Sequence, residues 1–188
     1  MDFSHYTDEP VDLAVALINT SQISKDRIAD LGQLKSFLEE YRDLWDGVAK
    51  PVTSADLKKI HQLRDSLRSV IDCADDVSAA RRVNEILNEH GAKPRVSVHN
   101  GAAHFHFEPL DSSMSSWLGA TTAMGLASVM VENGRSRFGV CNAGDCEDVY
   151  VDASRNRSRR HCSSTCSTRE AVTAYRRRQT AGSAVVDA

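Results

Sequence analysis

Residues 137–169 read RFGVCNAGDCEDVYVDASRNRSRRHCSSTCSTR and contain four of the five cysteines of the chain. Their spacing is Cys141-x4-Cys146-x15-Cys162-x3-Cys166. Two cysteines on a short turn between strands and two at the beginning of a helix can converge on one metal ion. Zinc prefers four such ligands in a tetrahedron. The spacing therefore predicts a Zn2+ site with these four ligands in a treble-clef arrangement, which is a metal-binding turn followed by a hairpin and a helix.

The predicted site is structural, because four thiolates leave zinc no open position for an activated water. An odd number of cysteines and an N-terminus without a basic or apolar signal segment indicate a reducing cytoplasm, where disulfides are rare. The alternatives are four free thiols, or His161 in place of one cysteine. Cys73, the fifth cysteine, lies far from the others in sequence and is predicted to be a small core residue.

Arginines surround the cysteine cluster in sequence and make it a candidate nucleic-acid interface. Guanidinium groups suit phosphates and guanine edges. The alternative is a solvated basic face that only aids solubility. The candidate contact residues are Arg155, Asn156, Arg157, Arg159, Arg160, Arg169, Arg176 and Arg177.

Charge is distributed unevenly along the chain, although the 188 residues have a net charge of only −3. Residues 1–134 contain 13 Lys and Arg against 20 Asp and Glu, whereas residues 135–188 contain 10 Arg, no Lys and 6 acidic residues. Such asymmetry indicates two parts with different partners. We expect a helical domain at 1–134, a zinc finger at 135–180 and a flexible tail at 181–188.

Hydrophobic periodicity predicts several helices before the cysteine cluster. The expected helices cover 10–20, a single stripe from Leu31 to Trp45, a segment after Thr53 with Asp56 completing a capping box, 77–90 ending at Gly91, and 113–133. Trp45 and Trp117 lie on these apolar stripes and are predicted core residues. A last helix is expected at 163–179.

A change to alternating polarity predicts one β-hairpin, with strands at 95–99 and 104–107 around Asn100-Gly101. The expected fold is therefore α+β, with a mainly helical N-terminal domain, one hairpin and a C-terminal treble-clef-like finger. His99, His104 and His106 lie on this hairpin, and a second metal site there is the alternative to histidines on a partly wet strand face.

Residues 112–131 carry no charge but include seven Ser or Thr and two Gly. A spanning helix requires about 20 predominantly apolar residues. We therefore expect a buried helix with small residues for close packing, and no membrane partner.

The run from Arg137 to Cys141, then Cys146, then the segment 149–162, resembles the CGNR-type zinc finger. The helices, the hairpin and the long helix that precede it resemble, in their order, the ABATE domain of a family of stress-induced transcription regulators. The resemblance covers nearly the whole chain. It implies zinc ligation by the four cysteines and binding of double-stranded DNA by the basic finger. The naming motif is altered, because Cys166-Ser167-Thr168-Arg169 stands where the family has Cys-Gly-Asn-Arg.

The sequence thus favours a cytoplasmic, non-enzymatic regulator of transcription in the bacterial cytoplasm and nucleoid. Its basic finger would contact DNA, and the helical domain would bind a small-molecule effector or form a homodimer. The alternatives are a zinc-stabilised module for protein or RNA interaction without a promoter target, and an enzyme. The enzyme alternative has no support from a phosphate-binding loop or a nucleophile motif.

Overall fold

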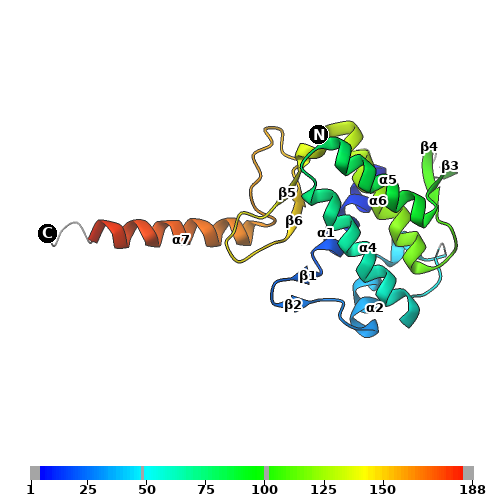
Figure 1. Cartoon of the computed structure of the whole chain (residues 1–188), viewed down its shortest axis with the longest axis horizontal. Helices are drawn as coiled ribbons and strands as arrows, with labels where there is room; N and C mark the ends of the chain where they lie inside the picture. The colour runs from blue at the N-terminus through cyan, green and yellow to red at the C-terminus, as the bar shows by residue number, and fades with distance from the viewer. Residues whose placement is uncertain (1–4, 48, 100–101, 184–188) are drawn as a thin grey trace.

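Helix α6, Met114–Asn133, is the central element of the helical body, in a computed structural model that describes residues 5–47, 49–99 and 102–183 (Figure 1). Its side chains are buried on several faces, including Met114, Leu118 and Leu126. Its length and composition alone would allow it to cross a membrane, yet 61% of its most apolar window is buried. The prediction of a buried core helix is confirmed.

Three further long helices, α1, α4 and α5, pack against α6, and the remaining elements of the body are short. The elements of the body are α1 (His5–Ile18), β1 (Ser21–Gln22), β2 (Lys25–Asp26), α2 (Leu31–Glu39), α3 (Arg42–Trp45), α4 (Ser54–Asp72), α5 (Asp76–His90), β3 (Lys93–His99), β4 (Ala102–Glu108) and α6. The finger consists of β5 (Phe138–Val140), β6 (Val149–Val151) and α7 (Ser164–Ser183). The three sheets among the described residues are two-stranded and antiparallel.

Small residues let the helices approach α6 closely, as the sequence predicts. A Cβ atom at Gly125 would lie only 2.8 Å from the backbone carbonyl carbon of Pro10. Helix α1 therefore crosses α6 backbone against backbone at this point, and a larger residue would push the two helices apart.

The predicted helix boundaries are mostly confirmed because local hydrogen bonds determine them. The Thr53 backbone N–H donates to the Asp56 carboxylate at 2.9 Å, as a capping box requires. Helix α5 ends at Gly91, whose φ of 65° is the left-handed conformation that glycine tolerates best.

Two local predictions are wrong. The expected single helix from Leu31 to Trp45 is broken at residues 40–41 into α2 and α3, because the Trp45 indole folds back and donates to the Leu38 carbonyl at 2.9 Å. The last helix continues to Ser183 rather than ending at Gln179, and residues 184–188 of the predicted tail lie outside the described residues.

The core does not end at the predicted boundary between residues 134 and 135. Phe138 and Val149 are buried in the same cluster as Leu13, Leu67 and Trp117. Trp45 belongs to this cluster too, and half-buried Cys73 packs against it, so both tryptophans and the fifth cysteine occupy the predicted core. The first half of the finger therefore packs into the core of the helical body.

Candidate metal centre and basic finger

The first two cysteines lie on a turn that extends the β5–β6 hairpin. The Cys141 backbone N–H donates to the Asp148 carbonyl at 2.9 Å, and the Cys146 N–H donates to the Ala143 carbonyl at 3.0 Å. Gly139 of β5 lies under the Tyr150 ring, where a Cβ would come within 2.5 Å of that ring. The turn that carries both thiols is therefore supported by backbone hydrogen bonds and by the close contact between Gly139 and Tyr150.

The second two cysteines lie at the beginning of α7. Cys162 precedes the helix, and Cys166 lies in its first turn, where its backbone N–H donates to the Ser163 hydroxyl at 3.2 Å. This cap satisfies one of the free N–H groups at the helix start. Ser163 therefore caps the start of α7.

The four sulfur atoms lie within 4.8 Å of one another. The Cys146 and Cys162 sulfurs are 3.7 Å apart, and those of Cys162 and Cys166 are 3.6 Å apart. A disulfide would require about 2.05 Å. A tetrahedron with metal–sulfur bonds of about 2.3 Å has edges of roughly 3.8 Å. The spacing of the sulfurs therefore fits a zinc ion and does not fit disulfides.

The cluster contains no ligand other than cysteine among the described residues. Cys141 and Cys166 are buried, and Cys146 and Cys162 are half-buried. His161 remains outside the cluster. The side chains of His99, His104 and His106 lie outside the described residues, so the second metal site stays untested.

The environment of the thiols is arranged for negative charge at Cys141. Burial raises the pKa of this thiol, but backbone N–H groups of Ala143 and Cys162 and the neighbouring thiols outweigh that effect, so its pKa is lowered. Burial raises the pKa of Cys146 to about 11 and also raises the pKa of Cys162, where the neighbouring thiols add to the effect. A metal ion binds thiolates, so its binding would displace the protons of the Cys146 and Cys162 thiols.

Arg137 and Asp152 form a buried unit that shapes the arginine-rich loop 152–161. Arg137 is 1% exposed, and its guanidinium donates to the carbonyls of Asp152 at 3.0 Å and Ser154 at 2.6 Å. The Asp152 carboxylate accepts the backbone N–H groups of Ser154 and Arg159. Burial raises the pKa of Asp152, but these donors and the Arg137 charge outweigh it and lower the pKa.

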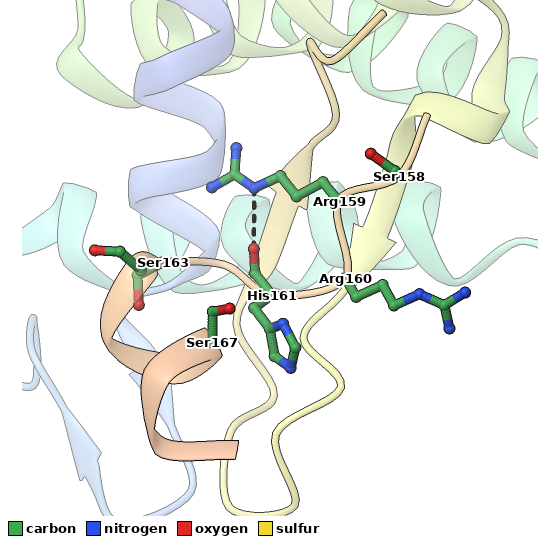
Figure 2. A pocket seen from close by; sticks show the side chains of 7 residues that line it. Ser158, Arg159, Arg160, His161, Ser163 and Ser167 are labelled. Carbon is green, nitrogen blue, oxygen red and sulfur yellow. Dashed lines mark hydrogen bonds between the residues drawn. The ribbon is translucent and has the colours of Figure 1, made fainter. Parts of the chain in front are cut away.

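Arg159 is directed toward its own backbone. Its guanidinium donates to the carbonyl of His161 at 2.9 Å (Figure 2). It also donates to the carbonyls of Val151 at 3.1 Å and of Cys162. It also lies 5.1 Å from the centre of the Tyr150 ring, whose hydroxyl donates to the Arg159 carbonyl at 2.7 Å. Arg159 therefore holds the loop against the cysteine cluster.

Two other predicted contact residues also have internal partners. Arg157 adopts a φ of 51° and donates to the Ser136 hydroxyl at 2.8 Å and to the Asn133 carbonyl at 3.3 Å. Arg169 forms an ion pair with Asp145 at 2.7 Å and donates to the Cys166 sulfur at 3.4 Å. The charge pattern alone gave no signal for these roles, because their partners come together only in the folded finger.

The remaining predicted contact residues point outward. Within the described part of the chain, the side chains of Arg155 and Arg160 form no hydrogen bond or ion pair, and both are exposed. Asn156 on the same loop and Arg176 and Arg177 on α7 are also exposed. Next to Arg160, an open cleft of about 570 Å³ is lined by residues of the loop and of the first turn of α7 (Figure 2).

Comparison with family models divides the chain into two regions, and their boundary lies close to residues 134–135, where the acidic part of the sequence gives way to the arginine-rich part. Residues 11–133 match the ABATE family model, described as "Putative stress-induced transcription regulator". The chain belongs to the ABATE family. Residues 137–179 match the CGNR zinc finger. No curated protein matches the chain. The four-cysteine cluster of this ABATE protein lies within its CGNR finger and is its zinc site.

The altered motif of this ABATE protein keeps the parts that touch the zinc site. Cys166 supplies a sulfur, and Arg169 donates to that sulfur. Ser167 and Thr168, which replace the Gly-Asn pair of the family, are exposed on α7. The replacement therefore leaves the metal ligands and their arginine partner in place.

The two family regions are joined by hydrogen bonds that the sequence did not reveal. The Asn19 side chain donates to the Val149 carbonyl at 3.0 Å and accepts its backbone N–H at 2.7 Å. Arg68 of α4 donates to the Glu147 carbonyl at 2.7 Å. An amide side chain at the end of α1 thus pairs with β6 as a neighbouring strand would.

Proposed function

We propose that this protein is a cytoplasmic transcription regulator whose zinc finger binds double-stranded DNA. The observation that carries the proposal is the exposed arginine surface on the zinc-held loop and on α7. Residues 135–188 have a net charge of +4, and their exposed guanidinium groups suit a polyanion. The acidic helical body would face away from the nucleic acid.

The arginines divide into two groups in this proposal. Arg155, Arg160, Arg176 and Arg177, together with Asn156, are the proposed DNA contacts. Arg157, Arg159 and Arg169 support the loop and the metal site, through hydrogen bonds and an ion pair of their guanidinium groups within the finger and its junction with the body. Replacing Arg159 would thus disturb the loop as well as any contact with DNA.

The test is DNA binding by the full chain across a series of salt concentrations, measured by fluorescence anisotropy. The association constant falls with salt, and each lost phosphate contact makes the negative slope of log K against log salt shallower by about 0.9. The double variant Arg155→Ala, Arg160→Ala should therefore make this slope less negative by roughly 2. The control is Arg82→Ala on α5, where the arginine pairs with Glu85 and lies far from the finger in sequence.

Duplex DNA and structured RNA are compared in the same assay. An unchanged slope in the double variant, or tighter binding to RNA than to DNA, would contradict the proposal and favour the RNA-interaction module. Catalysis is not proposed, because four thiolates leave the zinc ion without an open position.

For the helical domain we propose effector sensing or homodimerisation. A single helix reads few base pairs, so regulators of this size often bind two half-sites as dimers. An open cleft of about 440 Å³ is a candidate effector site; its lining includes Arg27, Asp30 and Phe37. Sedimentation of the full chain with and without duplex DNA tests the dimer.

A further inference from the structure

Helix α7 extends away from the body after its first turn (Figure 1). From Ser167 to Gln179 no residue is buried, and Val172 and Tyr175 are 42% and 56% exposed. Twenty residues of α-helix span about 30 Å. Helices are only marginally stable in water unless one face is packed. A helix of this length without a packed face therefore suits a surface outside the chain.

The side chains of α7 restrict the kind of surface. Ala171, Val172 and Tyr175 share one side, since residues three and four apart are neighbours on a helix. The next positions on this side are Arg178 and Gln179, so the apolar stripe ends after one turn. A helix that binds a protein groove usually continues its apolar positions over two or more turns. The short stripe does not suit a protein groove.

Charge points to a polyanion as the occupant. Arg176, Arg177 and Arg178 are consecutive and exposed, so they spread around the helix, and Glu170 is the one acidic residue between Ser164 and Ser183. The major groove of B-DNA is about 12 Å wide and admits a helix, with thymine methyl groups as apolar spots among polar base edges. The major groove of duplex RNA is too narrow for side chains to read.

The zinc site fixes α7 relative to the loop. Cys162 and Cys166 flank the helix start, and Arg160 lies two residues before Cys162. A helix lying in the groove would therefore carry the exposed loop arginines toward the adjoining phosphate backbone.

We propose that α7 is the base-reading element, lying in the DNA major groove with Val172 and Tyr175 toward the bases and the loop arginines on phosphates. This inference rests on the proposed DNA-binding function. It separates sequence preference, which depends on α7, from general affinity, which depends on Arg155 and Arg160.

The test begins by selecting the preferred site of the full-length wild-type protein from random duplex DNA. Dissociation constants are then measured for that site and for an unrelated duplex. The double variant Val172→Ala, Tyr175→Ala should reduce the ratio of the two constants by roughly ten- to a hundredfold, with little change on the unrelated duplex. Alanine is the best helix former, so helix loss does not explain this result, and circular dichroism checks it.

Two matched variants sharpen the test. Arg155→Ala with Arg160→Ala should weaken binding to both duplexes by a similar factor and preserve the ratio. Val77→Ala, at a residue 72% exposed on α5, should change neither constant.

The outcomes distinguish the inference from the proposed function. If the wild type prefers one site and the Val172/Tyr175 variant keeps that preference, α7 is not the reader, although DNA binding stands. A wild type that binds DNA without any preference also overturns the inference. A wild type that binds no duplex DNA overturns both. Equal binding of duplex RNA overturns the major-groove assignment.

Discussion

The helical body and the zinc-held part of the finger are stabilised by different physical means. In the body, fully buried side chains such as Leu13, Leu67 and Leu118 belong to one large apolar cluster. Around the zinc site, the corresponding cluster contains the four cysteines and Ala143. Apolar burial therefore stabilises the body, whereas 152–183 depends on metal coordination and on arginine hydrogen bonds. Between them, the β5–β6 hairpin belongs to both, since it packs into the body and carries two ligands.

Metal removal should have the largest effect on this contrast. Structural zinc sites contribute roughly 10–16 kcal/mol of apparent binding free energy. We expect chelation, or Cys162→Ser, to unfold residues 152–183 while the body and the β5–β6 hairpin remain folded. Hydrogen exchange measures this directly, and circular dichroism should show the loss of α7.

The control for metal removal is Cys73→Ser, which should leave one zinc ion per chain because Cys73 is remote from the cluster. Loss of exchange protection throughout α6 upon chelation would show that the body also depends on the metal. The contrast between the two regions would then be wrong.

A cavity in the body should give the second largest effect. Unlike metal removal, it should destabilise the body and leave the zinc site intact. Leu118 is fully buried, and Leu118→Ala should lower the free energy of unfolding of the body by about 2–5 kcal/mol. Urea unfolding followed by tryptophan fluorescence measures the body alone, because both tryptophans lie in its core. Zinc content below the transition should not change.

The matched control on the same helix is Val131→Ala, at a side chain 86% exposed, which should change stability by less than about 0.5 kcal/mol. A fall in zinc affinity parallel to the loss of body stability in Leu118→Ala would contradict the independence of the two regions.

The link between the regions should give a smaller effect. Asn19→Ala removes both hydrogen bonds to Val149 and leaves the backbone N–H and C=O of this buried residue unsatisfied, at a cost of about 1–3 kcal/mol. Amide exchange at Val149 should accelerate, most strongly after chelation. Asn19→Asp keeps the acceptor and loses the donor, so its exchange rate at Val149 should lie between those of the wild type and Asn19→Ala. Equal exchange in all three proteins would mean that hydrophobic packing alone holds the hairpin.

A pH effect confined to the body should be the smallest. The Asp56 carboxylate accepts hydrogen bonds from Thr53 and Ser115, which lower its pKa although burial opposes them. A lowered pKa in the folded state stabilises the body above the unfolded value near 3.8, and this stabilisation is lost as pH falls below it. At pH 7, Asp56→Asn should cost about 1 kcal/mol. Urea titrations should show this difference shrinking between pH 5 and pH 3, and a constant difference would contradict the assignment.

Sequence reasoning succeeded where a short segment determines its own structure. The capping box at Thr53, the helix stop at Gly91 and the four-cysteine spacing each depend on residues close in sequence or on one ion. The same reasoning missed the break between α2 and α3, where the Trp45 indole donates to the Leu38 carbonyl seven residues earlier and competes with the periodic stripe.

The roles of the arginines could not be predicted for a related reason. Arg155 and Arg159 look alike in sequence and are both exposed, yet only Arg159 donates to three carbonyls that the folded loop brings together. Asn19 likewise lies 130 residues from its partner, and nothing near it in sequence indicates a strand neighbour.

The pairing of Asn19 with Val149 bears on how such a chain can change over evolutionary time. The family regions end and begin at residues 133 and 137, which looks like a natural point for recombination. A finger transferred to a different helical domain would lose its amide partner and leave the outer edge of β6 exposed. The end of the first helix and the zinc hairpin are thus expected to be inherited together, so the chain is less modular than its two family regions suggest.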